Sequence, residues 1–171
     1  MSVSKRSYPH AGQKLNESAH RTALKNDLLK LRAEDSEDLG VVASLLQDAV
    51  LCCADMSLQK SDVDSQQRFV MVLSRFCWEK ACIAGDDQVK QRVHCAFIIN
   101  HVVEAQYYGF DQFDTGLVLS VLTIELHEPT KMMIYFAGDA AIKLTIDMTS
   151  CILHDLDDPY STPFLPSHKI A

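Results

Sequence analysis

An arginine, a glutamate and the single tryptophan of the chain lie close together at the end of a predicted strand. If the strand continues through them, Arg75, Cys77 and Glu79 share one face. Phe76 and Trp78 then share the other face. Charged groups beside an aromatic ring are typical of a recognition surface. The spacing favours a simpler alternative, an exposed Arg–Glu ion pair worth about 0–1 kcal/mol next to a tryptophan in the core.

Two other groups have the residue types needed for acid–base chemistry or metal binding. Glu125 and His127 have i, i+2 spacing near the end of the longest predicted strand, which puts an acid–base pair on one face. The segment from His154 to Asp158 carries an imidazole and three carboxylates, the ligands of a hard divalent cation. It lacks the glycine and the closing glutamate of a calcium loop, so a solvated acidic segment, Asp155 to Asp158, is the favoured interpretation.

A predicted junction between a helix and a strand supplies two further candidates. Gln47 and Asp48 stand at this junction, where side chains either cap the turn or face a ligand, and capping is commoner. Together with Arg75, Trp78 and Glu79, they are the residues for which we predict a binding role.

The sequence contains no motif of a known catalytic or cofactor-binding class. Its six glycines never have phosphate-loop spacing, and neither a GxSxG elbow nor an HExxH pair occurs. The six cysteines include no CxxC pair and no zinc-finger spacing, and most lie in apolar runs as small core residues. We therefore predict no cofactor, no metal site, six free thiols and a cytoplasmic location.

The charge is distributed unevenly along the chain. Residues 1–33 carry seven Lys or Arg and two acids, a net charge of +5. Residues 34–171 carry nine Lys or Arg and 21 acids, a net charge of −12. Nucleic acid is an unexpected partner for the acidic body, because binding it needs a basic face. The basic segment has the charge to contact nucleic acid, an anionic membrane or a partner, but we expect residues 1–27 to be a disordered, solvated extension. No secretory signal and no apolar run long enough for a membrane span is present.

Residues 28–158 are predicted to form one mostly-β domain, followed by a tail over residues 159–171. Residues 29–33 fit a short strand, or a helix through Leu24, Leu28 and Leu31. Asp35 is predicted to cap a helix that ends near Gln47. Further strands are predicted at 50–56, 68–76, 93–99, 102–108, 117–126, 132–136 and 141–146, with a hairpin at 137–140.

The run 148–156 fits either a helix or a continued strand. Seven or eight mainly antiparallel strands with one or two helices indicate an α+β, mostly β fold. Two architectures satisfy this pattern: a small closed barrel that resembles pleckstrin-homology folds, and a sandwich backed by a helix.

Three stretches resemble a small alphaproteobacterial family of domains of unknown function. They are residues 28–50, 68–79 and 136–144, and the Leu-Gln-Asp-Ala-Val run at 46–50 and Arg-Phe-x-Trp-Glu at 75–79 are their most specific parts. The resemblance spans about residues 28–158 and implies a bacterial cytoplasmic setting. The family has no established activity, so it implies no catalytic residues.

We predict a non-enzymatic domain that holds a protein or peptide on its sheet surface or at a sheet edge. The alternative is a small enzyme or a metal-dependent regulator, with a site near Glu125 and His127 or near Asp155 to Asp158.

Overall fold

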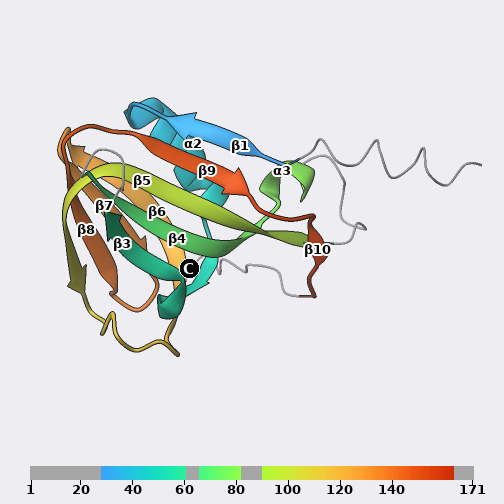
Figure 1. The fold of residues 1–171 in the computed structure, drawn as a ribbon. Helices are drawn as coiled ribbons and strands as arrows, with labels where there is room; N and C mark the ends of the chain where they lie inside the picture. Colours follow the sequence, from blue (N-terminus) through green and yellow to red (C-terminus); the bar gives the residue numbers. More distant parts are fainter. Residues whose placement is uncertain (1–27, 61–65, 82–89, 164–171) are drawn as a thin grey trace, which may run out of the picture.

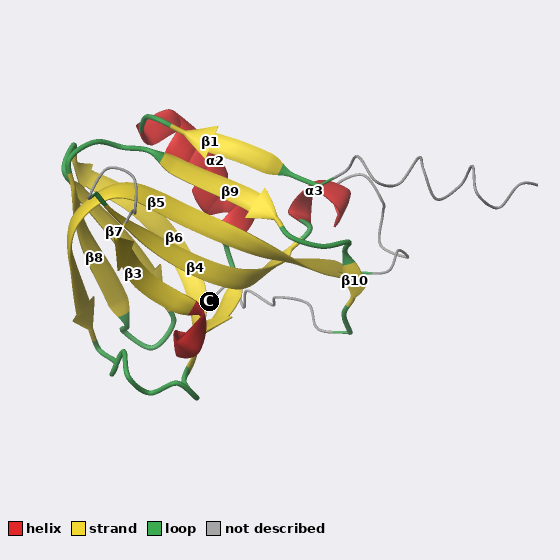
Figure 2. Cartoon of the chain, viewed as in Figure 1, coloured by secondary structure: helices red, strands yellow, loops and turns green. Residues whose placement is uncertain are grey.

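The computed structural model describes residues 28–60, 66–81 and 90–163. The predicted disordered extension over 1–27, the predicted turn at 62–65 and the predicted loop at 84–87 lie outside these residues. The described part is built around one ten-stranded sheet, with two α-helices (Figures 1 and 2). None of its helices is long and apolar enough to cross a membrane.

Six antiparallel strands of the sheet close into a barrel. In order around the ring, they are β2 (Val50–Cys52), β4 (Gln67–Phe76), β5 (Gln91–Tyr108), β8 (Ala141–Ile146), β7 (Lys131–Phe136) and β6 (Val118–Glu128). The predicted α+β, mostly β fold is therefore confirmed, in its closed-barrel form rather than as a sandwich.

The other elements extend the barrel on its sides. Strand β1 (Lys30–Ala33) pairs with β9 (Cys151–Asp155), and both β9 and β10 (Tyr160–Ser161) pair with β5. Strand β3 (Met56–Lys60) pairs with β4. Helix α2 (Ser36–Leu46) packs on β6 and β1, and the short helix α3 (Trp78–Ala81) follows β4 (Figure 1).

Helix α2 begins and ends where the sequence indicates. Asp35 Oδ1 accepts a hydrogen bond from Asp38 N at 2.9 Å, which caps the helix start. At the other end Gln47 is the C-cap, and Asp48 has a positive φ of 59° that turns the chain into β2. The apolar face of the helix lies on the core through its buried residues Leu39, Val42, Ala43 and Leu46.

Strand β5 is one strand of 18 residues, whereas the sequence analysis predicted two. The predicted bend is present, because His101 has a φ of 58° and the register shifts between Val102 and Glu104. The chain bends without leaving the sheet, so the first half of β5 pairs with β4 and β9 and the second half with β8.

The structure corrects or decides four other expectations. The predicted strand 50–56 is interrupted by a 3₁₀ turn, η1 (Cys53–Asp55). Strand β4 ends at Phe76, as the predicted range 68–76 has it, so Trp78 and Glu79 lie on α3. The strand faces expected if the strand continued, Arg75 with Glu79 and Phe76 with Trp78, are therefore not formed. The ambiguous run 148–156 contains a strand, β9, and the predicted tail from residue 159 includes β10.

The two faces of β4 are unequal. Phe69, Met71 and Leu73 are buried inside the barrel, whereas Val70 and Val72 on the outer face are partly exposed. Four of the five described cysteines are buried, and all five are free thiols, as predicted: Cys52, Cys53, Cys77, Cys95 and Cys151.

Two glycines provide a test of the backbone geometry. Gly109 has a φ of +74°, and a Cβ there would press on the backbone of Asp139 and Ala140. Gly109→Ala should therefore lower the free energy of unfolding by about 1–3 kcal/mol. Gly40, in helix α2, has open space around it, so Gly40→Ala should raise it by about 0.5–1 kcal/mol. Urea unfolding measures both free energies. Equal effects of the two substitutions would contradict the positive φ and the close backbone contact at Gly109.

Candidate functional site

Arg75 is fully buried and makes all of its contacts within the domain. Its Nε and Nη2 atoms donate to the two carboxylate oxygens of Asp155, both at 2.8 Å. Its Nη1 and Nη2 atoms donate to Glu79 at 3.0 and 2.9 Å, and Nη1 also reaches the Phe76 carbonyl at 3.3 Å. The ion pair with Glu79 expected from the sequence exists, but on a buried arginine whose five N–H groups all have acceptors.

Asp155 holds three separated parts of the chain together. Besides Arg75, its carboxylate accepts a hydrogen bond from Leu29 N at 3.1 Å, and its own N donates to Leu29 O at 2.9 Å. Because Asp155 is committed to these contacts, it is not free to bind a cation. Within residues 28–60, 66–81 and 90–163, no group of three or more His, Cys, Asp or Glu is placed to hold a metal ion.

The other predicted binding residues adjoin this ion pair. Trp78 is half-buried, packs on Phe76 with ring centroids 4.6 Å apart, and donates from Nε1 to Gln47 O at 3.2 Å. Arg92 donates to the carbonyls of Asp48 and Ser74 at 3.1 and 2.7 Å. The structure thus brings the predicted residues together through internal contacts, and their ligand-binding role stays a prediction.

Glu125 and His127 lie on the outer face of the barrel with a third residue beside them. His127 Nε2 is 3.2 Å from Glu125 Oε2 and 3.1 Å from Tyr135 Oη. Tyr135 comes from the neighbouring strand β7, so the sequence spacing within β6 does not reveal it. Both Glu125 and His127 are about half-exposed, and an acid–base pair there faces bulk water.

A polar cluster that the sequence analysis missed attaches β10 to the barrel. His94 Nδ1 is 2.8 Å from Asp157 Oδ2, and the His94 ring contacts Tyr160 with centroids 5.1 Å apart. Tyr160 Oη shares a hydrogen bond with Ser74 Oγ, and Ser74 stands opposite His94 in the register of β4 and β5. The hydrogen bond from His94 holds the pKa of Asp157 below its usual range. These contacts span more than sixty positions, so no local motif reveals them.

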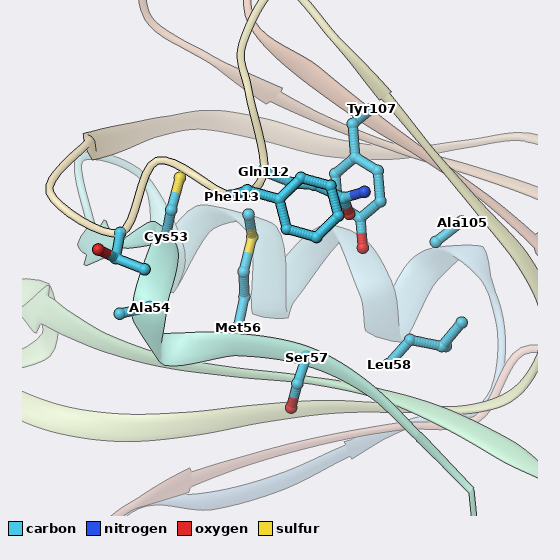
Figure 3. Close-up of a pocket in the computed structure, with 10 residues that line it drawn as sticks. Cys53, Ala54, Met56, Ser57, Leu58, Ala105, Tyr107, Gln112 and Phe113 are labelled. Carbon is cyan, nitrogen blue, oxygen red and sulfur yellow. The ribbon is translucent and has the colours of Figure 1, made fainter.

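A pocket of about 540 Å³ opens at the other end of β4, and the sequence analysis predicted none of its lining residues (Figure 3). The lining comes from η1, β3, the second half of β5 and the loop of residues 109–117. In Figure 3 the side chains of Met56, Tyr107 and Phe113 point toward one another. The remaining lining residues are Cys53, Ala54, Ser57, Leu58, Ala105, Gln112 and Thr115.

The pocket lies along an unpaired strand edge. Among the described residues β3 pairs with β4 alone, and its residues Ser57 to Lys60 are exposed. We call this edge together with the pocket the β3 groove. Phe113 is 80% exposed, an unusual position for a phenylalanine, in the loop between β5 and β6. Phe113 is the one aromatic or aliphatic residue of the run 111–116, and this was the signal for the site in the sequence.

The lining of the β3 groove includes one buried thiol, that of Cys53. Cys53 is buried there, and burial, followed by the nearby Cys52, Asp114 and Asp111, raises the pKa of its thiol. A thiol that stays protonated is a poor nucleophile and a poor metal ligand.

Gln67, opposite Lys60 of β3 and Val102 of β5, has a buried side-chain oxygen with no hydrogen-bond partner among the described residues.

The buried ion pair can be tested against an exposed one. Arg75→Leu should lower the free energy of unfolding by about 3–5 kcal/mol, because Asp155 is left buried without its partner. Arg32→Leu removes an exposed 3.7 Å ion pair with Glu34 and should change it by less than about 0.5 kcal/mol. Denaturant unfolding followed by circular dichroism makes the comparison. Similar losses in the two variants would show that Asp155 does not depend on Arg75.

Glu79 should add a pH-dependent part to the stability. Partial burial acts to raise its pKa, but hydrogen bonds from Arg75 and the backbone, with the charges of Arg75 and Lys80, hold it below the usual 4.5. A lowered folded-state pKa stabilises the fold above about pH 4.5, and this contribution is lost as the pH falls further.

Glu79→Gln should therefore cost about 0.5–1 kcal/mol near pH 7, a modest value because the Glu79 side chain is 37% exposed and water screens the pair. The difference from wild type should shrink below about pH 4.5 in urea unfolding titrations. A difference that stays constant between pH 7 and pH 3 would show that the charge of Glu79 does not stabilise the fold.

Comparison with known proteins places the chain in a family. No curated protein and no solved structure matches it. Residues 29–168 match the family described as "Protein of unknown function (DUF2948)", and this range contains every described helix and strand, β10 included. The match covers most of the chain and leaves the basic segment before residue 29 outside. The chain therefore belongs to the DUF2948 family.

Proposed function

We propose that this protein is a non-enzymatic binding domain that holds an extended peptide segment of a partner protein in the β3 groove. The peptide adds a strand to the free edge of β3 and places one apolar side chain in the pocket. The observation that carries this proposal is the position of the pocket directly beside a strand edge that is unpaired within the described part of the chain.

The strand edge supplies binding energy that does not depend on the peptide sequence. Edge strands present unpaired N–H and C=O groups, and an added strand pairs with them. Strand β3 has five residues and ends the pairing order of the sheet. At the opposite end of that order, β1 lies beside helix α2, which makes β3 the more accessible of the two edges.

The pocket supplies selectivity for an apolar side chain. Its volume of about 540 Å³ lies within the range of about 300–1,000 Å³ found for ligand sites. Met56 and Tyr107 pack on the barrel core, so the floor is rigid, whereas Phe113 exposes its ring to water. Covering that ring with a ligand side chain removes apolar surface from water, which favours binding.

The proposal includes a setting in the bacterial cytoplasm, which the family resemblance implies and which the five free thiols favour. The rival, an enzyme or metal-dependent regulator, has less support. Its candidates are the water-exposed pair of Glu125 and His127 and a segment in which Asp155 and Asp157 bind Arg75 and His94.

Phe113 allows a direct test. A phage-displayed library of random nonapeptides is selected on the full chain, and an enriched peptide is synthesised for fluorescence anisotropy. Phe113→Ala should weaken its binding at least about tenfold, with little loss of stability because the ring is exposed. Leu122→Ala, which removes another exposed apolar side chain outside the pocket lining, should leave the affinity unchanged.

Amide hydrogen exchange of the complex with the enriched peptide gives a second measurement. The amides of β3 should exchange more slowly in the complex, because an added strand bonds that edge. A library that enriches no peptide, or peptides whose affinity is unaffected by Phe113→Ala, would refute the proposal.

A further inference from the structure

The border of the β3 groove is acidic. Asp55 ends η1 directly before β3, and Asp111 and Asp114 stand on either side of Phe113. Across η1, β3 and residues 109–117, all of which are described, Lys60 at the far end of β3 is the only Lys or Arg. These three segments therefore carry three carboxylates and one ammonium group. The second half of β5 adds Glu104 and no Lys or Arg, and Arg68 of β4 stands opposite Gln59 of β3.

Two of these carboxylates are held in place. Asp111 Oδ1 accepts from Phe113 N at 2.9 Å, and Asp114 Oδ1 accepts from Gly116 N at 3.1 Å. Backbone hydrogen bonds from Asp114 N to Asp111 O and from Leu117 N to Asp114 O, each 3.1 Å, close the turns between them. The side chains stay beside the pocket, and their charge acts on the Cys53 thiol at its floor.

We infer that the ligand of the β3 groove is a cationic peptide segment, with Lys or Arg next to the apolar residue that enters the pocket. This inference rests on the proposed function and adds the chemical class of the ligand. Fixed carboxylates beside an apolar surface attract a cation more strongly than the same charges in open water. An acidic peptide would bring like charges together, which gives the site selectivity by repulsion.

The ligand is assigned to a partner protein rather than to this chain. A second copy packed groove to groove would bring the same three aspartates to the groove, so like charges would meet. The chain's own residues 1–27 are basic, with five Lys or Arg and two acids, but they lie outside the family match that contains the groove. Because the groove belongs to the matched domain and the basic segment does not, we assign the ligand to a segment of another protein.

The test uses three acetylated, amidated nonapeptides with a central Phe between two Val. They differ only in the next pair of residues outward, which are Lys, Gln or Glu. Each is titrated into the ¹⁵N-labelled full chain at low salt, and amide shifts of β3 and residues 109–117 report binding. The Lys peptide should bind at least about tenfold more tightly than the Glu peptide. The ratio should fall towards one at about 0.5 M salt.

A matched pair of variants tests the source of the preference. Asp111→Asn/Asp114→Asn keeps a side-chain oxygen for both turn hydrogen bonds and removes two charges, so the preference for Lys should disappear and Gln-peptide affinity should not change. Asp147→Asn/Asp158→Asn removes the same charge at exposed positions outside the pocket lining and should keep the preference.

The outcomes separate the inference from the proposed function. If the three peptides bind the groove equally, the inference is overturned and the peptide-binding site stands. If none shifts the amides of the groove, both are overturned.

Two further results would overturn the assignment to a partner. One is a dimer in sedimentation velocity that the Lys peptide disperses. The other is movement of the groove amides in the free chain on Lys14→Glu/Arg21→Glu/Lys25→Glu substitution, which would make the chain's own basic segment the ligand.

Discussion

The buried ion pair between Arg75 and Asp155 is the constraint on which one end of the barrel depends. A guanidinium withdrawn from water is costly unless every N–H is bonded, and Arg75 meets this condition with Asp155, Glu79 and the Phe76 carbonyl. The two partners are 80 residues apart, so their geometry fixes where β9 crosses the barrel relative to β4. Through Leu29, Asp155 also fixes the start of β1.

The β3 groove follows from unequal strand lengths at the opposite end of β4. Strand β4 begins at Gln67, opposite Val102, whereas β5 continues to Tyr108 with its second half turned toward β8. Strand β3 borders the same end of β4 from the other side. No described strand fills the space between β3 and the end of β5, and the loop that carries Phe113 borders it.

Local patterns in the sequence predicted the elements, and contacts across the chain decided the site. The cap at Asp35, helix α2, strands β6 to β8 and the hairpin between β7 and β8 follow from spacing and turn chemistry. Alternation along β4 predicted the end of the strand at Phe76, but it could not reveal that Arg75 meets an aspartate 80 residues later. The β3 groove draws on four separate segments, so no single window of sequence contains it.

The two ends of β4 differ in what a ligand would have to displace. At the Arg75 end the charged groups bind one another, and a ligand would have to replace short, buried hydrogen bonds with equally good ones. At the groove end it meets an exposed phenylalanine and a strand edge that no other described strand pairs with. The side-chain oxygen of Gln67, which has no hydrogen-bond partner among the described residues, lies near them. Water covers the exposed groups, and its release from the apolar ones favours association. The Arg75 end of β4, with its buried hydrogen bonds, is suited to stability, and the groove end, with its exposed strand edge and aromatic ring, is suited to binding. Local stability and ligand binding make opposite demands on the same surface.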